Sequence, residues 1–427
     1  MRKLLRLVAW AVTLIFTMLG TSYAQTSEPI KIGVLHSLSG TMAISETTLK
    51  DTVLMMVEAQ NRRGGLLGRQ LEAVVMDPAS DWPTFAQQTR TLIEDEGVAV
   101  IFGCWTSASR KAVLPVLEEL DGLLYYPVQY EGQESSRNIF YTGAAPNQQA
   151  IPAADYLMRE DAVGATRMIL LGTDYVYPRT TNKLMRSYLN SRGISNADIL
   201  EIYTPFGHSD WQDIITQMAA FANQGKKTAV ISTLNGDTNI SFYQELARQG
   251  ITAQQMPVMA FSVGEQELSR LDTMGLVGHM AAWNYFMSVE AVENSRFIQN
   301  WQEYTKDPSR LTNDPMEATC IGFKMWAQAV EQAETTEVRA VRQAMYGQKV
   351  RNLTGGTAVM LNNHHISKPV LVGQIQADGQ FVVIWNTNGE VRGDAWSDYL
   401  PESAGLTADW TYPWLCGGCK TPKYADE

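Results

Sequence analysis

The sequence predicts an α/β protein built from doubly wound, mostly parallel sheets, and three observations carry this prediction. Short β-rich runs alternate with longer helical patterns through most of the chain, which is typical of repeated βαβ units. Several of these runs are apolar at consecutive positions, as expected of parallel strands covered on both faces. At 427 residues the chain exceeds the usual size of one compact domain, so we expect two lobes.

Residues 1–24 predict a secretory signal peptide that is cleaved after Ala24. Three basic residues precede an apolar run at 7–19, and small residues follow at 22–24. The apolar run is too short to span a bilayer comfortably. We therefore expect a periplasmic protein. Removal of the leader takes the formal net charge from −11 to −11 − 3 = −14, which argues against nucleic acid as a partner.

Eight β-rich runs are expected to form the strands. They occupy residues 30–35, 72–76, 98–102, 123–126, 167–171, 199–203, 229–233 and 256–261. Between the first two runs, apolar residues recur at helical spacing from Leu49 to Val57, and Gly64 and Gly65 end the helix. In doubly wound sheets ligands bind beyond the carboxyl ends of the strands, so the loops that follow the strands should hold the site.

The last third of the chain predicts a β-hairpin and a tail. The hairpin strands are expected at 370–375 and 380–385, because Asp378-Gly379 between them suits a tight primed turn. Residues beyond 396 are rich in aromatics, Pro and Gly, and include Cys416 and Cys419. A disulfide is favoured over a metal or redox site for these cysteines, since no second ligand pair accompanies them.

Four loops at predicted strand ends carry the candidate ligand-binding residues. In chain order these are Trp105 and Ser107; Tyr126, Gln129, Tyr130 and Glu131; Tyr175 and Tyr177; and Asn235 and Asp237. The hydroxyls of Thr106 and Ser107 open a predicted helix, where they suit either a ligand oxygen or a simple helix N-cap.

The residue types in these loops favour a small neutral amide. The aromatic residues can wall a narrow slot, while the amide and carboxylate side chains accept hydrogen bonds from N–H groups. Urea is flat and offers four N–H donors and one carbonyl, so it needs more acceptors than donors. No Arg or Lys lies in these loops, whereas a carboxylate or phosphate ligand usually calls for one.

An enzyme is not predicted. The chain lacks a Gly-x-Ser-x-Gly elbow, a His-Glu-x-x-His motif and a Walker-type phosphate loop. His364 and His365 are expected in a solvated polar turn rather than at a metal. We therefore expect neither a cofactor nor a metal.

Six segments carry a resemblance to a known family, the type I periplasmic binding proteins of the branched-chain amino acid and amide group. The segments are 32–40, 61–69, 103–107, 126–132, 145–148 and 174–179. The last four resemble the urea and short-chain amide branch, above all the urea-binding subunits of ABC importers. The resemblance covers nearly all of the chain after the leader.

The resemblance implies two lobes that are joined by three crossovers and close over a ligand by a hinge. Lobe one would take 25–145 and 283–355, lobe two would take 146–282 and 356–398, and 399–427 would form a tail. The partners it implies are urea or a short-chain amide and the ABC permease subunits of the inner membrane.

The resemblance also implies roles for individual residues. Trp105 and Tyr126 would be walls, Ser107 a hydrogen-bond donor, and Gln129 a selectivity residue, while Tyr175 and Tyr177 would close the site from lobe two. The similar amide-sensing regulator has Tyr at the Trp105 position and Pro at the Gln129 position. The larger wall and the added polar group favour urea over acetamide.

Three other functions stay open. A branched-chain or other amino acid would place its carboxylate at Ser107 and its ammonium near Glu131 or Asp237. A secreted amidase would need a nucleophile with a base in reach. An amide sensor coupled to a receptor would bind the same ligand without feeding a permease.

Overall fold

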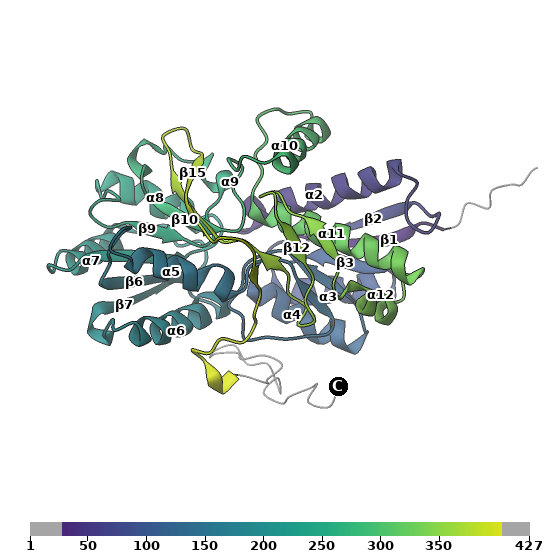
Figure 1. Ribbon diagram of the computed structural model, residues 1–427, viewed down its shortest axis with the longest axis horizontal. Coiled ribbons are helices and arrows are strands. Elements are labelled where there is room, and N and C mark those ends of the chain that lie inside the picture. The colour runs from purple at the N-terminus through teal and green to yellow at the C-terminus, as the bar shows by residue number, and fades with distance from the viewer. Residues whose placement is uncertain (1–27, 404–427) are drawn as a thin grey trace, which may run out of the picture.

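The computed structural model describes residues 28–403 as two α/β lobes that lie side by side (Figure 1). The predicted leader and the tail cysteines Cys416 and Cys419 lie outside the described residues. No helix within residues 28–403 combines the length and the apolar character needed to cross a membrane.

The first lobe is built on a five-stranded, fully parallel sheet with the order β2-β1-β3-β4-β5. Its strands are β1 (Ile30–Leu35), β2 (Leu71–Met76), β3 (Val100–Gly103), β4 (Leu124–Tyr126) and β5 (Ile139–Tyr141). The connecting helices are α2 (Ala43–Arg62), α3 (Trp82–Glu94) and α4 (Ser107–Glu119). All four residues of β3 are buried, because one apolar cluster involving α2 and another involving α3 and α4 cover the two faces of the sheet.

The second lobe carries a seven-stranded sheet with the order β15-β14-β10-β9-β8-β6-β7. Its strands are β6 (Arg167–Thr173), β7 (Ile199–Thr204), β8 (Thr228–Thr233), β9 (Val258–Ala260), β10 (Met280–Trp283), β14 (Leu371–Ile375) and β15 (Phe381–Asn386). Its helices are α5 (Ala150–Met158), α6 (Val176–Ser191), α7 (Gln212–Ala222), α8 (Thr238–Arg248) and α9 (Glu265–Leu268). The sheet is parallel except at one edge, where β14 pairs antiparallel with both β10 and β15.

The chain crosses between the lobes three times. After β10 it returns to the first sheet through α10 (Val292–Thr305), α11 (Asp314–Ala333) and α12 (Val338–Met345). Trp326 of α11 packs on Phe102 of β3, and Figure 1 shows the green α11 beside the purple α2. The short pairs β11 (Lys349–Arg351) with β12 (Thr357–Val359) and β13 (Ser367–Lys368) with β16 (Val391–Arg392) follow. The expected two-lobe α/β class with three crossovers is confirmed.

Asn284 ties the three crossover segments together. Its Nδ2 donates to the carbonyl oxygens of Gln148 at 2.9 Å and Pro369 at 2.7 Å, and these residues belong to the other two crossovers. Its own backbone N–H donates to Asp314 at 2.9 Å, at the start of α11. One fully buried amide therefore sets the spacing of the segments about which the lobes would rotate.

Two local predictions are wrong in detail. The hairpin forms, but among its turn residues only Gly379 has a positive φ, of 78°, and Gln376 accepts from its N–H. This fits a type I turn with a glycine bulge, because a primed turn of Asp378-Gly379 needs positive φ at both residues. His364 and His365 are buried rather than solvated, since their rings stack on Phe140 and Tyr141.

Candidate functional site

The loop after β3 is shaped by two unusual residues. A Cβ on Gly103 would come within 2.5 Å of the Leu35 carbonyl oxygen, so glycine permits β3 to approach β1 there. Cys104 takes a positive φ of 66°, a strained conformation for a residue with a side chain, and turns the chain into α4. Thr106 then caps the helix by accepting from the Ser109 N–H at 3.0 Å. Ser107 is consequently left free of the capping role.

The Ser107 hydroxyl is instead bound into a group of buried charges. It donates to Glu131 Oε2 and accepts from Arg110 Nη1 at 3.0 Å. Arg110 also pairs with Glu131 at 3.1 Å and with Glu134 at 2.7 Å, and Lys111 pairs with Glu134 at 2.6 Å. We call Arg110, Lys111, Glu131 and Glu134 the charged cluster.

The charged cluster is balanced and enclosed by aromatic rings. Two cations face two carboxylates, and the guanidinium of Arg110 lies 4.6 Å from the ring centre of Tyr126 and 4.7 Å from that of Tyr130. Burial alone would raise the pKa of Glu134, but Arg110 and Lys111 lower it to about 2. Each buried charge of the cluster keeps an opposite partner, so the loss of any one side chain would leave an uncompensated buried charge.

Four of the predicted contacts, Ser107, Tyr126, Tyr130 and Glu131, belong to the charged cluster or contact it. Glu131 is fully buried and its oxygens are engaged by Ser107, Arg110 and Lys111. Tyr130 stacks on Tyr141 at 4.9 Å, and its hydroxyl bonds His365. Burial lowers the pKa of His365 to about 4, so the ring is neutral near pH 7.

Gln129 lies in front of this cluster, where the two lobes meet. Its Nε2 donates to Ser262 Oγ, which follows β9 of the second lobe, at 2.5 Å. Burial raises the pKa of Tyr177, at the start of α6, while the side chains of Gln129 and Ser262 beside its hydroxyl lower it. We call Trp105, Gln129, Tyr175, Tyr177 and Ser262 the interlobe face.

The interlobe face holds buried polar atoms with no partner. Trp105 Nε1, Gln129 Oε1 and the Tyr177 hydroxyl are buried, and none of them has a hydrogen-bond partner within the described part of the chain. Each belongs to a side chain that is 3% exposed. An unpaired buried donor or acceptor is unfavourable by about 1–3 kcal/mol, so a donor and an acceptor together point to a ligand position.

Aromatic side chains of the second lobe complete this face. Tyr175 and Tyr177 are buried with Ala108 of α4, so the starts of α4 and α6 touch across the lobes. Phe206, after β7, packs on Tyr175 at 4.8 Å and on Trp82 of α3 at 5.6 Å. These contacts describe lobes that are closed on each other.

The loop after β8 places its two predicted residues differently. Asn235 is buried, and its side chain donates to the Thr233 carbonyl oxygen at 3.1 Å. Asp237 precedes α8 with its side chain exposed to solvent. A Cβ on Gly236, between them, would come within 2.7 Å of the Thr41 carbonyl oxygen. This loop thus presses on the first lobe through its backbone.

Sequence reasoning missed several residues at the junction. It found no Arg or Lys in the loops, yet Arg110 and Lys111 lie one helical turn beyond Ser107. It also missed Ser262, and Ser45 of α2, which donates to Glu267 of α9 at 2.8 Å across the lobes. A usable signal was present for the charged cluster, because Arg110 and Lys111 are matched by two glutamates three residues apart.

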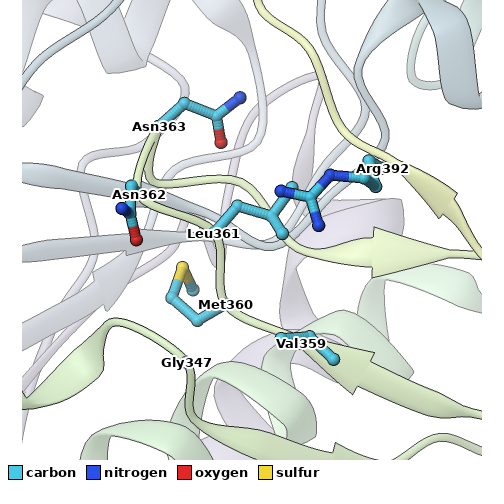
Figure 2. A pocket seen from close by; sticks show the side chains of 7 residues that line it. All are labelled: Gly347, Val359, Met360, Leu361, Asn362, Asn363 and Arg392. Carbon is cyan, nitrogen blue, oxygen red and sulfur yellow. The ribbon is translucent and has the colours of Figure 1, made fainter.

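A hollow in the surface is lined by none of these residues. Figure 2 shows it, with a volume of about 400 Å³, lined by Gly347, Val359, Met360, Leu361, Asn362, Asn363 and Arg392. It is open to solvent, and none of its lining side chains has a buried polar atom without a partner. We therefore place the candidate site at the interlobe face. Within residues 28–403 no cluster of His, Cys, Asp or Glu is arranged to hold a metal ion.

Two lobes of mostly parallel sheet, three crossovers and buried polar side chains where the strand ends meet are the architecture of a two-lobe solute-binding protein. The chain belongs to the periplasmic binding protein family, since the periplasmic binding protein domain matches residues 30–402. Membership of this family implies a periplasmic location.

Individual relatives are distant. A Leu/Ile/Val-binding protein homologue of Brucella melitensis is 26% identical over 51% of this chain and 56% of its own length. A protein of Geobacillus stearothermophilus named limonene hydroxylase is 26% identical over 32% of this chain and 25% of its own length. The chain thus spans a quarter to about a half of the length of these curated relatives.

The fold is shared with solved binding proteins. The solute-binding protein of an ABC transporter from Rhodopseudomonas palustris HaA2, in complex with p-hydroxybenzoic acid, superposes with a TM-score of 0.74. It is 19% identical, and the match covers 85% of this chain and 98% of that one. Sequence identity at this level establishes the shared architecture but does not identify the ligand of this chain, which has to be inferred from its side chains.

Proposed function

We propose that this protein is the solute-binding component of an ABC importer and that it captures urea, or a short-chain amide, at the interlobe face. The observation that carries the proposal is that Trp105 Nε1 and Gln129 Oε1 are buried and neutral and have no partner among residues 28–403. A donor for one carbonyl oxygen and an acceptor for one N–H match the two kinds of polar group in an amide. The aromatic side chains beside them suit a flat molecule.

The expected affinity is bounded by ligand size. A ceiling of about −1.5 kcal/mol per non-hydrogen atom gives urea about −6 kcal/mol, or a Kd of some tens of micromolar. Binding would act by stabilising the closed arrangement of the lobes over an open one, and only by the difference in affinity between the two. An inner-membrane permease would recognise the closed form. No catalytic role is proposed.

The test is titration calorimetry of the protein expressed from its full sequence. Urea is expected to saturate one site, with acetamide and formamide as comparisons. Gln129→Ala should weaken urea binding about 10-fold, because one acceptor is lost. Gln299→Ala, on the exposed surface of α10, is the matched control and should bind as the unchanged protein does. No heat with any amide would refute the proposal.

Amino-acid capture is the second candidate, because one relative is named a Leu/Ile/Val-binding protein homologue. Saturable heat with leucine and none with the amides would establish it. Ammonia release measured on the same samples separates both candidates from an amidase.

A further inference from the structure

The polarity of the Ser107 hydroxyl is set before any ligand arrives. A serine hydroxyl can donate one hydrogen bond and accept two. Its hydrogen is used on Glu131 Oε2, because a carboxylate between two cations can only accept. One of its lone pairs is used by Arg110 Nη1, at 3.0 Å. What remains of the Ser107 hydroxyl is an acceptor.

The Tyr126 hydroxyl is likewise left with acceptor capacity only. Its hydroxyl donates to the backbone carbonyl oxygen of Trp105, so only lone pairs remain on its oxygen. Burial is the main cause that raises the pKa of Tyr126, and Ser107 is among the groups that lower it. The Ser107 hydroxyl therefore lies beside the phenol of Tyr126. Two neighbouring hydroxyls, from the start of α4 and the end of β4, are therefore both acceptors.

The nearby cation does not offset this polarity. Arg110 directs Nε to Glu134 at 2.7 Å, Nη2 to Glu131 at 3.1 Å and Nη1 to Ser107. Its charge is balanced within the charged cluster, and its guanidinium lies against the rings of Tyr126 and Tyr130. A ligand carboxylate placed at Ser107 would meet the remaining lone pairs of Ser107 and Tyr126 and the negative charge of Glu131.

We infer that Glu131 is a positioning residue that fixes Ser107 and Tyr126 as acceptors, so that the site selects an N–H group at this position and rejects a carboxylate. This inference deepens the proposed function and rests on it for the ligand's place at the interlobe face. It reverses the donor role that the family resemblance implied for Ser107.

The experiment compares acetamide with acetate, which differ mainly in the group offered to Ser107, by titration calorimetry. The unchanged protein should prefer acetamide by at least about 100-fold. Ser107→Ala should weaken acetamide about 10-fold without gaining acetate. Glu131→Gln supplies an amide that can donate to Ser107, which frees the serine hydrogen for the ligand. The preference for acetamide should then narrow by about 10-fold or more.

Glu134→Gln is the matched control. It removes an equal charge from the charged cluster, but Glu134 contacts Arg110, Lys111 and Tyr141 rather than Ser107. Its melting temperature should fall while the acetamide-to-acetate preference stays. If Glu131→Gln does not fold, as judged by circular dichroism, the affinities of Ser107→Ala for acetamide and acetate test the inference on their own.

Three outcomes overturn the inference while leaving amide capture intact: acetate bound as tightly as acetamide, a Glu131→Gln preference like that of the unchanged protein, or undiminished acetamide binding by Ser107→Ala. Failure of the proposed function looks different, with heat from leucine alone. In that case 4-methylpentanoate, which lacks the ammonium group, replaces acetate as the comparison. The affinities for leucine and for 4-methylpentanoate would then be compared in the unchanged protein and in Ser107→Ala. If the ratio of the two affinities is the same in both proteins, Ser107 does not bind the ammonium group and the inference is overturned.

Discussion

The charged cluster and the interlobe face are neighbours that treat buried polar groups in opposite ways. Behind Ser107, Arg110 and Lys111 are matched by Glu131 and Glu134, and each has an opposite charge within reach. In front, Trp105 Nε1 and Gln129 Oε1 are equally buried and have no partner in residues 28–403. The charged side chains thus hold one another and Ser107 in place, while the neutral groups of the interlobe face are available to a ligand.

If this contrast holds, the largest effect should come from breaking the charged cluster. Arg110→Met keeps much of the side-chain volume but leaves Glu131 and Glu134 with Lys111 alone. The free energy of unfolding should fall by about 3–5 kcal/mol, because a buried charge loses its partner. Guanidinium chloride unfolding followed by fluorescence measures it. Guanidinium is preferred to urea here, since urea is the proposed ligand.

A surface arginine gives the control for this effect. Arg90 bridges Glu94 at 3.2 Å and also pairs with Glu119, but its side chain is 39% exposed. Arg90→Met should therefore change stability by less than about 1 kcal/mol. Equal losses in the two variants would mean that the charged cluster is no more than a set of ordinary ion pairs.

A second contrast separates two buried glutamates. Cations lower the pKa of Glu134 to about 2, against the effect of burial. Glu265 of α9 has a pKa raised to about 8, because burial acts without a cation and Glu267 and Asp314 add to it. Glu265 is 1% exposed and accepts from the Met287 N–H at 2.7 Å.

This difference predicts a loss of stability on the alkaline side. The folded protein keeps a proton on Glu265 that the unfolded chain releases above its ordinary pKa of 4.5. The contribution is complete below that value and is lost as the pH rises through about 8. Between about pH 6 and pH 8 the loss should be about 2 kcal/mol. Glu265→Gln should flatten this slope in melts taken across the range, whereas an unchanged slope would assign the proton elsewhere.

The sequence specified the fold because periodicity and apolar runs are local properties. The run at 30–35 is β1, and the run at 98–102 overlaps β3 at Val100–Gly103. The hairpin was located correctly, but its turn type depends on the register of β14 and β15, which the dipeptide Asp378-Gly379 does not determine. The burial of His365 depends on Tyr141, which is distant in the chain.

The candidate site was harder to predict, since it depends on which side chains pair. The strand-end rule found the loops that hold Trp105, Ser107 and Gln129, because it follows from topology alone. It could not assign Glu131, whose partner Arg110 comes from another element. A carboxylate that would accept from a ligand and one that binds an arginine look the same in sequence.

The smallest expected change in stability is the one that best isolates the interlobe face. Trp105→Phe removes the Nε1 donor while keeping an apolar ring in a site that is 3% exposed. Because this donor has no partner among the described residues, its loss should alter the free energy of unfolding by less than about 1 kcal/mol. Urea affinity should nevertheless fall about 10-fold, since the carbonyl oxygen of the ligand loses its donor. Calorimetry and guanidinium unfolding of the same variant measure both quantities. Stability lost without affinity would make Trp105 a packing residue and move the ligand elsewhere, whereas affinity lost without stability would assign the unpaired indole to the ligand.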